Sequence, residues 1–250
     1  FSRRKAPSSM ADKADMLVFV PTYNERENVE RLCAEIIDLG LGADLLFIDD
    51  NSPDGTGEIL DSLEKRYPCL RVLHRARKDG VGSAHMQGIA WAYNQNYRTL
   101  ITMDADFTHL PKDIVALLQY KDSHDVVVGT RYQDSESLEG WSLWRKTLTY
   151  GGHLLTKVLL NMDYDATGAL RVYRLQAIPK EVFQQATSKG YSFFFESLYL
   201  LHINKFRIKE VPIRLPARAL GHSKMTLREI ANSIRRLFVM FWIRLRSSFK

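Results

Sequence analysis

Short apolar runs alternate with helical patterns through the first half of the chain. Four of the five runs end directly before Pro, Gly or Asp, which is typical of buried strands. The runs are Met16–Val20, Leu45–Ile48, Leu70–Leu73, Leu100–Met103 and Val126–Val128. Between them apolar residues recur every three or four positions, as expected of amphipathic helices. This alternation predicts an α/β fold with an open, mostly parallel sheet and helices on both faces.

The pattern is less regular over residues 132–225. It predicts three helices and a strand, near Tyr150–Leu160, Glu181–Thr187, Phe195–Asn204 and Ile208–Ile213. No internal repeat or low-complexity linker divides the chain. We therefore expect a basic tail at 1–14, one catalytic domain at 15–225 and a helix at 226–250.

The last 25 residues carry an apolar stripe at helical spacing, formed by Leu227, Ile230, Ile234, Leu237, Phe238, Phe241 and Leu245. Five arginines surround it, with Trp242 nearby. Such a basic amphipathic helix is expected to lie in an anionic membrane surface. The stripe equally fits packing on the chain's own body or docking to a small membrane-spanning partner subunit. The strongly apolar run Leu237–Ile243 has seven residues, whereas a spanning helix needs about 20.

Charge refines this picture. The 250 residues have a formal net charge of +6, with +3 on residues 1–13, +5 on 226–250 and −2 on 14–225. A nucleic-acid-binding protein usually carries its basic stripe on the folded body, so we predict no nucleic-acid partner. The two cysteines, Cys33 and Cys69, are too few for a disulfide scaffold and lack metal-ligand spacing.

Polar side chains gather where the predicted strands end. Ligands of open α/β sheets bind outside the carboxyl ends of the strands. The residues at these positions are Tyr23 and Glu25, Asp50, Asp104 and Asp106, and Arg131, which follow the first, second, fourth and fifth strands. Any one of them could be a cap or turn residue, but together they predict a ligand site at one edge of the sheet.

Asp104-x-Asp106 is the most informative of these elements. Two carboxylates two residues apart in an extended chain fall on one side, and they suit Mg²⁺ or Mn²⁺. A phosphate-binding GxxxxGK[ST] loop is absent. Gly80-x-Gly82 lacks the third glycine of a dinucleotide-binding fingerprint, which argues against a nicotinamide-dependent oxidoreductase.

Five ordered segments carry a resemblance to a known family: Val20–Asn28, Ile48–Thr56, Met103–Asp106, Gly129–Tyr132 and Gly221–Lys224. In these segments the chain resembles the inverting family-2 glycosyltransferases, and among them the dolichol or polyprenol phosphate mannose synthases. The resemblance runs from about Leu17 to Met225. It implies a Rossmann-like GT-A fold.

The resemblance also implies residue roles. The nucleoside of a sugar donor would contact Pro21, Tyr23, Glu25, Ile48 and Asp50. Asp104, Ala105 and Asp106 would line the diphosphate and sugar, with Asp106 as a direct ligand of the metal ion and Asp104 beside it. Lys78 would approach the donor. Arg131 and Arg145 would receive a lipid phosphate, with Arg131 also near the donor. Arg218 and Lys224 would lie on a loop that closes over the diphosphate.

Three positions depart from the family pattern. Thr167-Gly168-Ala169 stands where a Gly-Gly or Gly-Ser pair is usual, and Thr108 stands where a Gln can assist the metal. Asp50-Asn51-Ser52 replaces an Asp-Gly-Ser sequence. The first two changes bear on the site itself, and the third is modest.

The sequence therefore predicts a metal-dependent glycosyltransferase that moves mannose from GDP-mannose to dolichyl or polyprenyl phosphate. A phosphate monoester has a second pKa of about 6, so it can attack without a strong general base. We expect a β-linked product, formed at the cytoplasmic face of the endoplasmic reticulum or the plasma membrane. The alternatives are a glucosyltransferase that uses UDP-glucose and a non-catalytic nucleotide-sugar binding protein.

Overall fold

The computed structural model describes residues 14–134, 137–138, 140–215 and 226–248. These residues contain a seven-stranded sheet with the order β3-β2-β1-β4-β6-β5-β7. The strands are β1 (Met16–Thr22), β2 (Asp44–Asp49), β3 (Leu70–His74), β4 (Thr99–Thr102), β5 (Val126–Thr130), β6 (Arg171–Arg174) and β7 (Ile208–Pro212). In the parallel register Phe19 pairs with Leu46 on one side and Thr102 on the other. The predicted mostly parallel α/β sheet is confirmed.

Strand β6 is the element that the sequence pattern did not reveal. It lies antiparallel between β4 and β5, and its four residues include two arginines. Arg171 is nevertheless fully buried, because its guanidinium donates hydrogen bonds to the carbonyl oxygens of Ala166 and Phe194, both at 2.9 Å. Satisfied hydrogen bonds let a charged side chain occupy a core position that a hydrophobicity pattern cannot identify.

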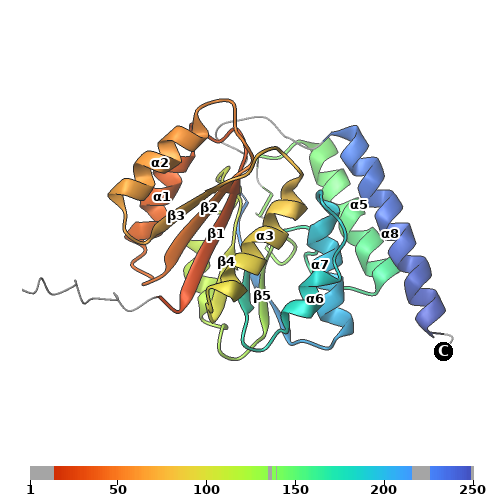
Figure 1. Cartoon of the computed structure of the whole chain (residues 1–250). Coiled ribbons are helices and arrows are strands. Elements are labelled where there is room, and N and C mark those ends of the chain that lie inside the picture. Colours follow the sequence, from red (N-terminus) through yellow and green to blue (C-terminus); the bar gives the residue numbers. More distant parts are fainter. Residues whose placement is uncertain (1–13, 135–136, 139, 216–225, 249–250) are drawn as a thin grey trace, which may run out of the picture.

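Helices cover both faces of the sheet (Figure 1). Alternate residues of β1 point to opposite sides, so Leu17 and Phe19 belong to one core and Val18 and Val20 to the other. The first core is closed by α3 (Val81–Asn94), α6 (Lys180–Gln184) and α7 (Ser192–Ile203). The second is closed by α1 (Val29–Asp38), α2 (Thr56–Arg66) and α4 (Asp113–Leu118).

Two long helices, α5 (Leu143–Leu160) and α8 (Leu227–Ser248), lie side by side outside these layers (Figure 1). The predicted stripe of α8 is divided between two environments: Leu237 is buried in the first core, whereas Ile234 and Phe238 are exposed. The helix therefore packs on the chain's own body and still presents apolar side chains outward. Among the described residues, none of the helices combines the length and apolar character needed to span a bilayer.

Candidate active site

A cavity opens at the edge of the sheet where β1, β2 and β4 end. Its walls come from these strand ends and from the N-terminal parts of α3, α7 and α8. The lining residues are Pro21, Thr22, Tyr23, Glu25, Asp50, Lys78, Gly80, Val81, Ala84, Asp104, Ala105, Asp106, Tyr191 and Glu229. Of the strand-end side chains expected at one edge of the sheet, all except Arg131 line this cavity.

The two aspartates at the end of β2 have different roles. Asp49 accepts hydrogen bonds from the backbone N–H of Ser52 at 3.0 Å and from its hydroxyl at 2.6 Å, so it organises the turn. Asp50 lines the cavity, and Arg75 donates to its Oδ1 at 2.5 Å. Burial raises the pKa of Asp50, and the neighbouring Arg75 opposes that effect. Of the two aspartates, Asp50 is therefore the one on the cavity wall.

Lys78 and Tyr23 face each other across the same part of the cavity. The Lys78 ammonium lies 3.8 Å from the centre of the Tyr23 ring, which is within the range of a cation–π contact. Glu25 accepts a hydrogen bond from the Asn28 amide at 2.7 Å. This wall therefore combines an aromatic ring with a positive charge.

The Asp104-Ala105-Asp106 segment follows β4 and lies on the cavity wall. Thr108 donates to Asp106 Oδ1 from its backbone N–H at 3.1 Å and from its hydroxyl at 2.6 Å. Thr108, which stands where the family pattern has a Gln, therefore orients Asp106. Within the described part of the chain, no cluster of three or more His, Cys, Asp or Glu side chains surrounds a metal position. Two carboxylates fit a hard divalent cation that takes its other oxygen ligands from water or a bound phosphate.

His109 lies behind this pair. It is buried, its Nδ1 is 3.8 Å from Asp104 Oδ2, and neither ring nitrogen has a hydrogen-bond partner. Burial, helped by the nearby Arg131 charge, lowers the pKa of His109 to about 4. The imidazole is therefore neutral near pH 7 and adds no charge to the site.

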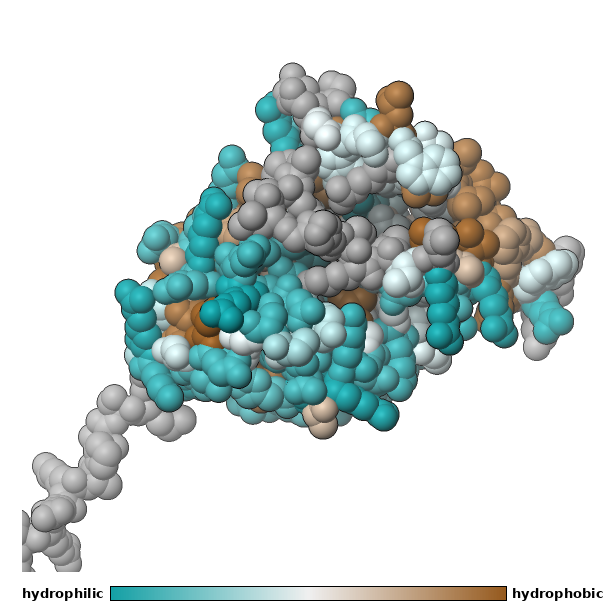
Figure 2. All heavy atoms as spheres, turned by 90° about the horizontal axis from the view of Figure 1, so that it is seen from above, coloured by the Kyte–Doolittle hydropathy of each residue, from teal (hydrophilic) through white to brown (hydrophobic). Residues whose placement is uncertain are grey.

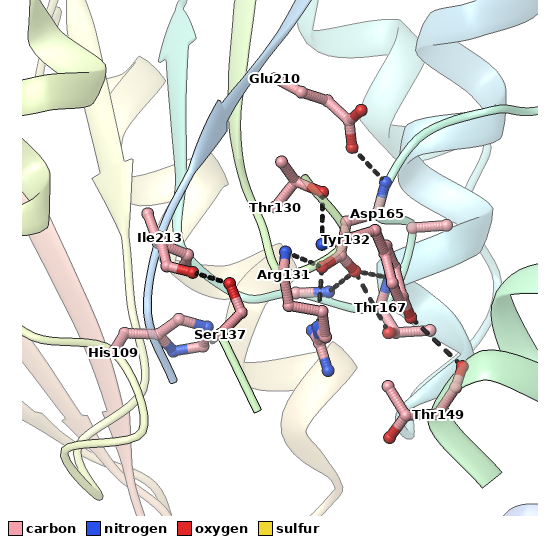
Figure 3. Close-up of polar contacts among 12 residues, drawn as sticks. His109, Thr130, Arg131, Tyr132, Ser137, Thr149, Asp165, Thr167, Glu210 and Ile213 are labelled. Atoms are coloured by element: carbon pink, nitrogen blue, oxygen red, sulfur yellow. Dashed lines mark hydrogen bonds and ion pairs between the residues drawn. The ribbon is translucent and has the colours of Figure 1, made fainter. Parts of the chain in front are cut away.

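Arg131 follows β5 and is held by a carboxylate that the sequence analysis did not select (Figure 3). Its Nε donates to Asp165 Oδ2 at 2.7 Å, and its backbone N–H donates to the same oxygen at 3.2 Å. Asp165 is completely buried. Burial opposes its ionisation, but the Arg131 charge and hydrogen bonds outweigh that effect and lower the pKa of Asp165. The Nε contact leaves the two terminal amino groups of the guanidinium to other partners.

The segment after Asp165 shapes the space around Arg131. The second carboxylate oxygen, Oδ1, accepts hydrogen bonds from the backbone N–H groups of Thr167 and Gly168 at 3.3 and 3.2 Å. A Cβ on Gly168 would lie 3.3 Å from a terminal nitrogen of Arg131. The Thr167-Gly168-Ala169 sequence departs from the family pattern but keeps Gly168, which leaves room for the Arg131 guanidinium.

Helix α5 packs against the residue next to Arg131. Tyr132 stacks on His153 with ring centres 4.0 Å apart and donates its hydroxyl to the Thr149 carbonyl oxygen at 3.2 Å. Arg145 lies in the first turn of α5, one helical turn before Thr149. The backbone of α5 thus brings the segments of Arg131 and Arg145 to the same region.

The structure assembles most of the predicted site. Of the predicted donor residues, Pro21, Tyr23, Glu25, Asp50, Lys78, Asp104, Ala105 and Asp106 line the cavity. Ile48 does not, because its side chain is completely buried in the core. Arg218 and Lys224 lie outside the described residues. Sequence reasoning missed Tyr191 and Glu229, which carry no motif and reach the cavity only through the fold.

Comparisons with known proteins were made for sequence and for structure. Residues 17–180 match the family model described as glycosyl transferase family 2. An undecaprenyl-phosphate mannosyltransferase of Micrococcus luteus is 34% identical over 212 residues, 84% of this chain and 87% of the relative. A polyprenol monophosphomannose synthase of Mycolicibacterium smegmatis is 34% identical over 223 residues, 88% of this chain and 84% of the relative.

Two solved structures show the same fold at low identity. Glucosyl-3-phosphoglycerate synthase of Mycobacterium tuberculosis, crystallised with Mn²⁺ and UDP-glucose, superposes with a TM-score of 0.64 at 17% identity, over 91% of this chain and 77% of that one. A mannosyltransferase of Pyrobaculum calidifontis, crystallised with GDP-mannose and Mn²⁺, has a TM-score of 0.50 at 14% identity, over 84% of this chain and 59% of that one.

Proposed function

The chain belongs to glycosyl transferase family 2, and we propose that it transfers mannose from GDP-mannose to a polyprenyl phosphate such as dolichyl phosphate. The observation that carries this proposal is the presence of two carboxylates, Asp104 and Asp106, on the cavity wall after β4, together with a buried arginine, Arg131, after β5 on the other side of β6. Both relatives at 34% identity are named for mannose transfer to a polyprenol phosphate.

The chemistry follows from two anionic substrates. A phosphate monoester is largely ionised near neutral pH, since its second pKa is about 6, and one of its oxygens can attack the anomeric carbon directly. The carbon–oxygen bond to the diphosphate breaks as the new one forms, and GDP leaves with the electron pair. A single displacement inverts the centre, so an α-linked donor gives a β-linked lipid phosphate mannose. His109 is neutral near pH 7, and the reaction does not require it to accept a proton.

Arg131 receives the acceptor phosphate. Its guanidinium is fixed through Nε by Asp165, so its terminal amino groups are oriented before the acceptor binds. Forked hydrogen bonds from a guanidinium to phosphate oxygens fix both position and charge. Arg145, one turn from the helical residue that contacts Tyr132, is proposed as the second phosphate ligand, and Arg218 and Lys224 as residues that close over the diphosphate.

On the donor side, Asp104 and Asp106 would hold Mg²⁺ or Mn²⁺. A divalent cation held there would supply positive charge to offset that of the departing diphosphate. Two solved structures of the same fold contain Mn²⁺ with a nucleotide sugar. Thr108 fixes the orientation of Asp106, while Asp50, Tyr23 and Lys78 surround the space proposed for the nucleoside.

The acceptor is a lipid, and the helices α5 and α8 offer a surface for it. Large apolar side chains stand exposed on both helices: Leu143, Trp144, Leu148, Leu154 and Val158 on α5, and Ile234, Phe238, Val239, Trp242 and Ile243 on α8. Hydrophobic residues gather on this side of the molecule in Figure 2. Exposed arginines, including Arg235 and Arg246, accompany them. We propose that this surface lies on the cytoplasmic side of an anionic membrane.

Vesicle binding tests the surface. Trp242→Ser should weaken binding to vesicles of anionic phospholipid about fivefold, because an exposed aromatic side chain loses its insertion into the headgroup region. Val115→Ser on α4, which also removes an exposed apolar side chain, is the matched control and should bind normally. Equal binding by both variants would reject this surface and favour the predicted contact with a small membrane-spanning partner subunit.

Turnover tests the reaction itself. The full chain is incubated with a polyprenyl phosphate, Mg²⁺ or Mn²⁺, and GDP-mannose, UDP-glucose or UDP-GlcNAc in parallel. We expect lipid-linked mannose from GDP-mannose alone and none after chelation of the metal. Glucose transfer from UDP-glucose would replace the proposed donor, and nucleotide binding without any transfer would support a non-catalytic binding protein.

A further inference from the structure

The cavity wall opposite the carboxylates is built from three separate parts of the chain. Tyr191 comes from the segment before α7, Gly80 and Val81 from the start of α3, and Glu229 from the first turn of α8. None of these residues belongs to a motif of the predicted site. The position of this wall therefore depends on how the 187–191 segment is held.

The 187–191 segment packs against α3 at unusually close range. The Ser83 backbone N–H donates to the Lys189 carbonyl oxygen at 3.1 Å. Gly80 has φ +93°, and a Cβ there would clash with that oxygen; a Cβ on Gly82 would lie 2.6 Å from the Ser188 carbonyl oxygen. The Gly80-x-Gly82 pair, which is no dinucleotide fingerprint, thus serves this approach of one backbone to another.

The contact continues from Ser83 to a residue of the predicted site. Arg75 donates to the Ser83 hydroxyl at 2.6 Å and to Asp50 Oδ1 at 2.5 Å. Asp50 lines the cavity. A shift of the 187–191 segment would therefore reach the carboxylate proposed to meet the nucleoside.

Glu196 of α7 holds the other side of the 187–191 segment. Its Oε1 accepts the Thr187 backbone N–H at 2.9 Å, and its Oε2 accepts that of Ser188 at 3.0 Å. Its carboxylate also pairs with Arg236 of α8. Only 2% of Glu196 is exposed. Burial opposes its ionisation, but the hydrogen bonds, with those from Ser188 and Arg236 foremost, lower the pKa of Glu196.

We propose that Glu196 is a positioning residue for the sugar-nucleotide donor: it fixes the 187–191 segment against α3 and, through Arg236, ties that wall of the cavity to α8. The inference rests on the proposed function, since it takes this cavity as the donor pocket. Glu196 does not line the cavity, so it acts through the backbone that it holds.

Glu196→Gln tests this role. The amide keeps the shape and one oxygen acceptor but loses the charge and places an N–H₂ group against a backbone donor. We expect the KM for GDP-mannose to rise about tenfold while the KM for the lipid phosphate stays within about twofold. Arg236→Ala should shift the donor KM in the same direction by about threefold, and should add nothing in the Glu196→Gln background.

Asp125→Asn is the matched control. Asp125 is also buried, also accepts a backbone N–H, from Arg207 at 2.9 Å, and also pairs with arginines, but it lies at the start of β5, away from the cavity. It should lower the melting temperature and leave both KM values unchanged. A Glu196→Gln variant that behaves like this control, or that changes both KM values equally, would overturn the positioning role.

Nucleotide binding separates this inference from the proposed function. Calorimetry with GDP or UDP and Mn²⁺ reports the pocket without turnover. Wild type should bind one nucleotide, and Glu196→Gln and Arg236→Ala should bind it more weakly. If wild type binds but does not transfer mannose, the proposed function fails and the Glu196 comparison stands. Equal binding by wild type and a folded Arg236→Ala variant overturns the link to α8, even where Glu196→Gln does not fold.

Discussion

The regions proposed for the donor and for the acceptor handle negative charge in opposite ways. The donor side presents carboxylates, Asp104 and Asp106, which repel a diphosphate until a cation lies between them. The group proposed for the acceptor is a cation, Arg131, which is not among the residues that line this cavity and is already paired with a buried carboxylate, Asp165. Two carboxylates in one region and a fixed guanidinium in the other suit the proposed metal-bound nucleotide and lipid phosphate, respectively.

The largest expected effect breaks the donor side. Asp106→Ala removes a carboxylate whose position Thr108 fixes, and kcat/KM should fall by about a thousandfold because charge on the leaving diphosphate is no longer neutralised. A titration of activity against Mn²⁺ measures the loss, with circular dichroism as the control for folding. Turnover near the wild-type level would remove the carboxylate pair from the mechanism.

The next effect breaks the acceptor side. Arg131→Ala should raise the KM for the lipid phosphate by about a hundredfold, because a buried, forked contact to phosphate is lost. Arg131→Lys should recover part of this loss, since its ammonium keeps the charge but not the fork. Initial rates over both substrate concentrations distinguish the sides. An increase confined to the KM for GDP-mannose would move Arg131 to the donor side.

A third prediction concerns Asp125, whose ionisation we expect to affect the free energy of unfolding and not substrate binding. Burial would raise the pKa of Asp125, but hydrogen bonds from Arg207 and Arg174 outweigh it and lower that pKa to about 2. A depressed pKa stabilises the fold above the unfolded value of about 3.9, and this contribution is lost as the pH falls toward 2. Urea unfolding at pH 7 and at acid pH should show wild type losing about 2 kcal/mol more than Asp125→Asn. Parallel curves for the two proteins would contradict this assignment.

The smallest effect sharpens the acceptor side. Asp165→Asn keeps an oxygen for the backbone of Thr167 and Gly168 but removes the charge beside Arg131, and the KM for the lipid phosphate should rise about tenfold. In the Arg131→Ala background the same change should add little to that KM, because its effect passes through the guanidinium. An additive loss would make Asp165 a general structural residue.

Much of the cavity lining could be predicted from the sequence, because several of its side chains directly follow strands. Asp50, Asp104 and Asp106 end regular apolar runs, and the edge of a parallel sheet brings them together. Ile48 and Arg131 do not line the cavity: Ile48 lies inside the strand with its side chain in the core, and Arg131 follows β5. In this region local pattern and tertiary position agree.

The supports of both sides could not be predicted. Asp165 lies 34 positions after Arg131 in an irregular segment, and Glu196 lies in a helix whose sequence is mostly apolar. Arg171 occupies a core position because carbonyl oxygens surround it. Contacts of this kind join segments that are distant in the sequence, so the periodicity and spacing of a single sequence do not predict them.

Helix α8 reaches from the cavity to the far end of the apolar surface. Its 22 residues span about 33 Å at the rise of an α-helix, with Glu229 on the cavity wall at one end and Trp242 exposed toward the other. A detergent micelle that covers the exposed end of α8 therefore contacts the same helix that borders the cavity at its other end. Purification in different detergents is then itself an experimental variable, and inhibitor screens should compare micelles with bilayer nanodiscs before ranking nucleotide analogues.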